Sequence, residues 1–129
     1  MTAEPRRKGL KVGASGFDLA TLEKIQRQLG ERRFCEIIGI FLDNTPDRLR
    51  RAQQGLSSDD LDDPAEALHS IKSSAAMFGA DELEQVAESM ERAAREKRVD
   101  DFRSGMPDLE RAIRAVDDFL RRCIERAGS

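Results

Sequence analysis

Apolar residues recur at intervals of three and four along most of this 129-residue chain, which is the spacing of one face of an α-helix. The spacing predicts five helices, which cover residues 18–29, 31–54, 64–78, 81–97 and 100–126. No stretch alternates between apolar and polar residues with the period of a strand. Because short connections favour antiparallel neighbours, the pattern predicts an all-α fold. We expect an up-down antiparallel four-helix bundle, with the additional short N-terminal helix capping one end.

Residues that typically begin or end helices flank these segments. Asp18 is expected to cap the first helix and Gly30 to end it. In the segment 63–66, Asp-Pro-Ala-Glu, the aspartate is predicted to be the N-cap and the proline the first helical residue. Gly79 is expected to end that helix in the left-handed conformation. Pro46 interrupts a helical stretch and should bend that helix or split it in two.

The first sixteen residues differ from the rest of the chain. They mix proline and glycine with charged residues and show no sustained periodicity. Such a composition is typical of a loosely attached terminus. We therefore expect residues 1–16 to form a flexible N-terminal tail and residues 17–127 to form the helical bundle domain.

Composition narrows the class of protein. Charged residues make up 36% of the chain and aromatic residues 5%, with no Trp and no Tyr, which suits a helical bundle. A net charge of −3 gives no general basis for nucleic-acid binding. No segment approaches the roughly 18 apolar residues of a membrane span, and the N-terminus lacks the apolar stretch of a signal peptide. We expect a cytoplasmic protein without a nucleic-acid or membrane partner, in which Cys35 and Cys123 are reduced thiols.

His69, the only histidine of the chain, lies within the predicted helix 64–78 but outside its apolar face. At about 100° per residue, the apolar residues of this helix fall within roughly 80° of one another, and His69 points roughly 140° away from their centre. Lys72 and Ser73 follow at plus three and plus four, so they are its neighbours on the helix surface. The sequence therefore presents an exposed imidazole, whose ring nitrogen is a nucleophile, beside a cation that suits an anionic reactant.

The segment around His69 resembles the signature of histidine-containing phosphotransfer (HPt) domains, which act in multistep phosphorelays. That signature is roughly His-x-(apolar)-Lys-Gly-(Ser/Ala)-(Ser/Ala)-x-x-(apolar)-Gly-Ala. The matching positions are His69, Ile71, Lys72, Ser74, Ala75, Phe78, Gly79 and Ala80. Ser73 stands where the family often has glycine. The resemblance extends more loosely over residues 17–127.

The resemblance implies a bundle fold and a phosphate-carrying function. His69 would accept a phosphoryl group on Nε2 from the phospho-aspartate of a receiver domain and pass it to an aspartate on another receiver. Lys72 would offset charge on this group, contacting phosphate more than protein, and Ser73 would be the small residue that keeps the approach to the ring open. We expect no cofactor on this chain, because Mg²⁺ would belong to the receiver. Partners would be response-regulator receiver domains and a (hybrid) sensor histidine kinase, and the chain would be a monomer.

The sequence lacks the motifs of several other kinds of catalytic or binding site. It contains no HExxH, no CxxC, no glycine-rich phosphate loop and no second histidine for a metal pair. Without an ATP-binding segment the chain should act as a phosphocarrier, with no kinase activity of its own.

Two alternatives remain open at this point. One is a helical-bundle interaction module that binds a receiver or kinase without carrying phosphate. The other is a metal- or ligand-binding bundle, which the single histidine disfavours because such sites usually pair Glu-x-x-His motifs.

Overall fold

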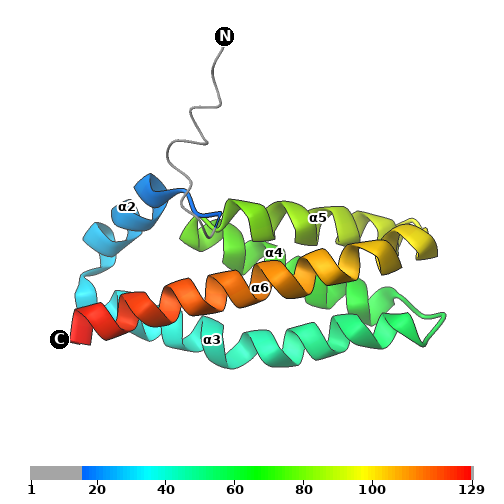
Figure 1. The fold of residues 1–129 in the computed structure, drawn as a ribbon, viewed down its shortest axis with the longest axis horizontal. Coiled ribbons are helices and arrows are strands. Elements are labelled where there is room, and N and C mark those ends of the chain that lie inside the picture. The colour runs from blue at the N-terminus through cyan, green and yellow to red at the C-terminus, as the bar shows by residue number, and fades with distance from the viewer. Residues whose placement is uncertain (1–15, 129) are drawn as a thin grey trace, which may run out of the picture.

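The computed structural model describes residues 16–128, and all regular secondary structure in this range is helical. The elements in chain order are α2 (Leu19–Leu29), α3 (Glu31–Gln53), the short 3₁₀ turn η1 (Gln54–Leu56), α4 (Asp62–Phe78), α5 (Asp81–Arg95) and α6 (Val99–Gly128). Figure 1 shows α3, α4, α5 and α6 running alongside one another, with α2 at one end. The predicted all-α bundle with an additional N-terminal helix is therefore confirmed.

Helix α4 packs between α5 and α3, and it also contacts α2 (Figure 1). The apolar face predicted for this helix is buried. Its largest members, Leu68, Ile71 and Phe78, are at most 1% exposed. They join residues of every other helix in one hydrophobic cluster. Because the apolar face is held in the core, the opposite face of α4 is left on the surface of the bundle.

Most predicted helix ends are found in the structure. The Asp18 carboxylate accepts a hydrogen bond from the backbone N–H of Ala20 at 3.1 Å, which caps α2. Gly30 follows the last residue of α2 with a φ of 81°, and Gly79 follows α4 in the left-handed conformation with a φ of 76°. Both glycines therefore occupy backbone conformations that residues with a Cβ rarely adopt.

The predicted cap at Asp63 is wrong. Helix α4 begins at Asp62, two residues before the predicted first helical residue Pro64, and no side chain caps it at the preceding Leu61. The Asp63 carboxylate instead forms an ion pair with Arg51 of α3, with 2.6 Å between Asp63 Oδ1 and Arg51 Nη2. A cation on a neighbouring helix thus replaces the expected local hydrogen bond.

Pro46 does not split α3, which runs through it as one helix. The preceding residue, Thr45, is buried, and its hydroxyl donates to the carbonyl of Phe41 at 2.6 Å. Packing on both sides of Pro46 keeps the helix continuous although the proline lacks an N–H.

The predicted tail, residues 1–16, lies outside the described residues except for Gly16. That residue is buried, and its carbonyl accepts a hydrogen bond from the backbone N–H of Glu82 at 3.2 Å. The next residue, Phe17, is completely buried and stacks on Phe119 of α6. The described part of the chain contains no helix that is long and apolar enough to cross a membrane.

Candidate functional site

His69 lies on the outward face of α4, and its side chain is 56% exposed. Its position follows from the helical register, since the adjacent Leu68 is completely buried in the core. One edge of the imidazole faces α5, where Nδ1 lies 3.2 Å from Oε2 of Glu91. The structure thus exposes the ring, as predicted, and holds one of its two nitrogens against a neighbouring helix.

Glu91 is the buried member of this pair. It lies near the C-terminal end of α5 with a side chain that is only 9% exposed. Burial alone raises the pKa of its carboxyl group, but the contacts with Lys72 and Arg95 and the charges of Lys72 and His69 outweigh burial and lower this pKa below the ordinary value. A carboxylate can only accept a hydrogen bond, so the proton of a neutral His69 belongs on Nδ1. Nε2 then carries the free lone pair.

Lys72 and Arg95 complete the environment of the Glu91 carboxylate. The ammonium of Lys72 lies 2.8 Å from Oε1, and the guanidinium of Arg95 donates to Oε2 at 2.9 Å. Oε1 is buried and accepts no hydrogen bond of standard geometry, so Lys72 is the charge that compensates it. The carboxylate therefore links His69 and Lys72 of α4 to Arg95 of α5.

The resemblance of the sequence to phosphotransfer domains led us to expect that Lys72 contacts phosphate more than protein. In the unphosphorylated chain the ammonium forms an ion pair with Glu91. The pair forms because α5 packs against the side of α4 on which Lys72 lies. Lys72 and His69 are nevertheless brought together, since both contact the same carboxylate.

Ser73 is exposed on α4, one turn after His69. The next residue, Ser74, faces α3, where its hydroxyl accepts a hydrogen bond from Arg48 at 3.2 Å. Ser73 is thus a small side chain on the open surface beside the imidazole, in the position that the sequence predicted.

Sequence reasoning missed Glu91 and Arg95. One signal was present: Glu91 follows Met90 within the apolar repeat of α5, and Arg95 stands four residues later, at ion-pair spacing. The sequence does not indicate how α5 is rotated relative to α4, and this rotation turns Glu91 toward His69. Among residues 16–128, no group of three or more His, Cys, Asp or Glu side chains is arranged to hold a metal ion.

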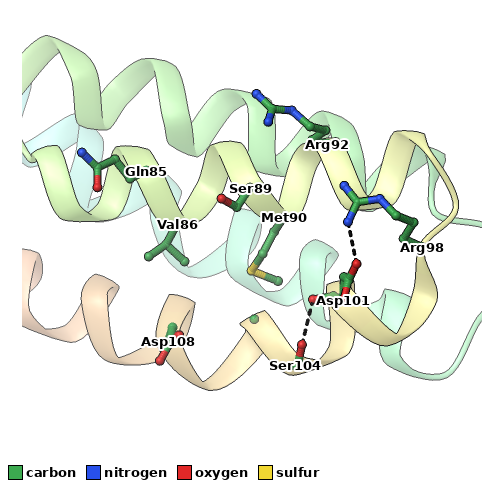
Figure 2. A pocket seen from close by; sticks show the side chains of 10 residues that line it. Gln85, Val86, Ser89, Met90, Arg92, Arg98, Asp101, Ser104 and Asp108 are labelled. Carbon is green, nitrogen blue, oxygen red and sulfur yellow. Dashed lines mark hydrogen bonds and ion pairs between the residues drawn. The ribbon is translucent and has the colours of Figure 1, made fainter.

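A separate groove of about 590 Å³ lies between α5 and α6. Figure 2 shows Val86, Ser89 and Met90 lining one wall, with the ion pair between Arg98 and Asp101 at one end. At about 100° per residue, Val86 and Ser89 lie roughly 140–160° around α5 from Glu91. The groove is therefore on the opposite side of α5 from His69.

Comparisons with known proteins agree with this fold. The sequence model of the Hpt domain family matches residues 36–119, a range that includes His69, Lys72 and Glu91. The crystal structure of histidine-containing phosphotransfer protein B (HptB) from Pseudomonas aeruginosa PAO1 superposes with a TM-score of 0.81. The two sequences are 21% identical, and the match covers 88% of this chain and 98% of HptB. No curated protein matches the sequence. Because the family match spans well over half of the sequence and the fold agrees with it, the chain belongs to the Hpt domain family.

Proposed function

We propose that His69 carries the phosphoryl group in the histidine phosphotransfer that this family performs in phosphorelays. One observation carries the proposal. The imidazole is exposed on α4, and an ionised, buried carboxylate holds its Nδ1. This arrangement leaves Nε2 as a nucleophile with a free lone pair. Phosphoryl transfer depends mainly on positioning and charge stabilisation, which are the contributions that this site can make.

The transfer step is a displacement at phosphorus. The Nε2 lone pair attacks the phosphorus of a receiver's aspartyl phosphate, the N–P bond forms, and the P–O bond to the aspartate breaks. The aspartate carboxylate leaves with the electron pair. The phosphorylated ring keeps its proton on Nδ1 and becomes cationic, so Glu91 compensates the positive charge that develops. Transfer to a second receiver is the reverse of this step.

Lys72 and Ser73 have supporting roles in the proposal. The Lys72 ammonium lies beside the imidazole through their shared contact with Glu91. It can offset negative charge on the phosphoryl oxygens without accepting the group itself. Ser73 leaves the surface next to the ring free of bulk, so that a partner can approach Nε2.

The proposal also extends to the partners and setting of the chain. Receiver domains and a sensor histidine kinase, hybrid kinases included, would exchange phosphate with it, and the receiver would supply Mg²⁺. The chain would act in the cytoplasm as a monomeric phosphocarrier without kinase activity or a cofactor of its own.

A phosphotransfer profile tests the proposal. The chain is mixed with each ³²P-labelled receiver domain of the source organism, and the label on the chain is followed over time. Wild type should take label from at least one receiver, and His69→Gln should take none. Circular dichroism should give the same helical content and nearly the same melting temperature for both, because surface substitutions usually change stability by less than about 0.5 kcal/mol.

Two outcomes would contradict the proposal. Labelling of His69→Gln would mean that another residue accepts the phosphoryl group. A wild-type chain that binds receivers but never becomes labelled would be an interaction module.

A further inference from the structure

We infer that the groove between α5 and α6 is a docking surface for the basic N-terminal segment of this same chain, residues 6–12. The inference goes beyond the proposed function, because the groove lies on the opposite side of α5 from His69. It follows from the place where the described chain begins, from the course of the groove, and from the charge of the segment and of the bundle.

The first described residues lie between α5 and α6. Gly16 is against α5, since its carbonyl accepts a hydrogen bond from the backbone N–H of Glu82 at 3.2 Å. A Cβ placed on Gly16 would stand only 2.6 Å from the Cβ of Glu82. Phe17 is against α6, where its ring stacks on Phe119 with 4.4 Å between the ring centroids. The preceding residues of the chain are therefore attached at the junction of these two helices.

This junction is in line with the groove. On α5, Val86 and Ser89 line the groove and follow Glu82 by four and seven residues, so all three lie on one face of the helix. On α6, Asp108 lines the groove and precedes Phe119 by eleven residues, which is close to three full turns. The groove therefore starts next to the point where the described chain begins and runs away from it between α5 and α6.

The segment is long enough to occupy the groove. Ser89 lies about 10 Å from Glu82 along α5, and Arg92 lies about 15 Å from it, at 1.5 Å per residue. An extended chain spans roughly 3.3 Å per residue. Four residues before Gly16 therefore reach the level of Ser89, and eight residues reach beyond Arg92. Residues 13–15, which would cross the start of the groove, are Gly, Ala and Ser, so no bulky side chain obstructs that path.

The chemistry of the segment matches the walls of the groove. The groove has a volume of about 590 Å³, and the apolar side chains of Val86 and Met90 contribute to one wall (Figure 2). In an extended segment, alternate side chains point to the same side. Leu10 and Val12 can therefore face the apolar wall together, while Lys11 between them faces solvent.

Charge favours the same contact. The chain has a net charge of −3, and residues 1–15 contain four basic side chains and one acidic side chain. Residues 16–129 therefore have a net charge of −6. At the start of the groove, residues 81–90 of α5 include four acidic and no basic side chains. A basic segment that enters from this end thus meets negative charge first.

The two arginines of the groove do not oppose this charge pattern. Figure 2 shows Arg98 and Asp101 at the end of the groove away from Gln85, and they form an ion pair at 2.5 Å. Arg92 is paired with Glu88. A tethered segment is also present at an effective concentration of the order of millimolar, so a weak contact is sufficient for it to occupy the groove.

Nuclear magnetic resonance tests the inference. The ¹H–¹⁵N spectrum of the full chain is compared with that of a chain lacking residues 1–14, after circular dichroism has shown equal helical content. The amide signals of Ser89 and Ser104 should differ between the two chains, because the segment covers them only in the full chain. These signals are decisive, since both residues lie well along the groove from the new terminus. The amide signal of Ser73, on the outward face of α4, should be the same in both.

A charge-matched pair of variants tests the groove itself. Ser89 is exposed in the groove, and Ser89→Arg adds bulk and positive charge there with a good helix former. In this variant the difference between full and shortened chains at Ser104 should disappear. Gln28→Arg adds the same charge on the exposed surface of α2 and should leave that difference as it is in wild type.

A spin label gives a measurement that needs no shortened chain. Cys35→Ala and Cys123→Ala remove the free thiols, and Gly9→Cys then carries a nitroxide. The label should broaden the amide signals of Ser89 and Ser104 and leave that of Ser73 sharp. Because the segment and the groove belong to one molecule, the broadening should not change on dilution.

Three outcomes would overturn the inference. The first is equal signals at Ser89 and Ser104 in the full and shortened chains, or a difference at Ser104 that persists in Ser89→Arg. The second is broadening confined to residues outside the groove. The third is broadening that fades on dilution, since the groove would then hold the segment of a second copy. None of these measurements involves phosphate, so their failure is distinct from failure of the proposed function.

Discussion

At the scale of single residues, Glu91 gives Lys72 a second role. The sequence predicted that the Lys72 ammonium contacts phosphate. In the structure it lies 2.8 Å from the buried Oε1 of Glu91. That oxygen accepts no hydrogen bond of standard geometry. Lys72 is therefore part of the packing between α4 and α5 in the unphosphorylated chain. During transfer the phosphoryl group would compete with Glu91 for the same ammonium.

Lys72→Met should both slow phosphotransfer and lower stability. The methionine keeps an unbranched apolar side chain but removes the charge that compensates Glu91. We expect a loss of about 1–2 kcal/mol in the free energy of unfolding, the usual cost of a buried acceptor that loses its partner. Urea unfolding measures this loss, and transfer rates with one cognate receiver measure the effect on function. An unchanged urea midpoint would show that the ion pair contributes nothing in solution, and an unchanged transfer rate would remove Lys72 from the mechanism.

At the scale of the secondary-structure element, α4 has two roles, packing in the core and presenting the site residues. The helical periodicity places these two sets of residues on opposite faces. One face holds Leu68 and Ile71 in the core, and the other presents His69 and Ser73 to solvent. This division follows from 3.6 residues per turn, so the exposure of both site residues could be predicted from the sequence. The start of the helix could not be predicted in the same way, because Arg51, a residue of another helix, binds the carboxylate of Asp63.

Ser73 provides a test of the open surface on α4. Ser73→Phe should reduce phosphotransfer and receiver binding at least about tenfold, because an aromatic ring one turn from His69 would occupy the space that a receiver needs. Ser73→Gly should stay active and lose about 0.5 kcal/mol of stability, since glycine is unfavourable inside a helix. Transfer rates, receiver Kd and urea unfolding are measured on both variants side by side. Full activity of the phenylalanine variant would mean that a receiver does not pass over this turn.

At the scale of the whole molecule, the packing of α5 on α4 brings a buried carboxylate to an exposed imidazole. Glu91 contacts two residues of α4 and one of its own helix. Burial raises the pKa of this carboxyl group, but the contacts with Lys72 and Arg95 and the charges of Lys72 and His69 outweigh burial, so the pKa is lowered. A carboxyl group with a lowered folded-state pKa stabilises the fold above its unfolded-state pKa and loses this contribution as the pH falls through the folded-state value.

The stability of the chain should therefore depend on Glu91 in acid. Unfolding by urea at a series of pH values compares wild type with Glu91→Gln. Wild type should be the more stable protein at pH 7, and the difference should shrink as the pH falls below about 4.3, the ordinary value for glutamate. Glu88→Gln is the matched control, because Glu88 is on the same helix and in an exposed ion pair with Arg92. Its effect should be small at every pH. A difference between wild type and Glu91→Gln that stays constant through acid pH would exclude this role of the carboxylate.

The helices of this protein and the residues on their surfaces can be predicted from the amino-acid sequence alone. The local spacing of apolar residues predicts each helix and leaves His69 and Ser73 outside the core. This is possible because the number of residues between two positions of a helix fixes the angle between their side chains around its axis. The motif around His69 also indicates the family without reference to distant residues. The side of α5 that faces α4 is set by the packing of the whole bundle. This packing brings the Glu91 carboxylate to Nδ1 of His69 and pairs that carboxylate with Lys72 and Arg95. Contacts of this kind depend on the rotation and register of packed helices, and these are set by many side chains that are distant in the sequence. The spacing of residues within one helix shows only which of them share a face of that helix.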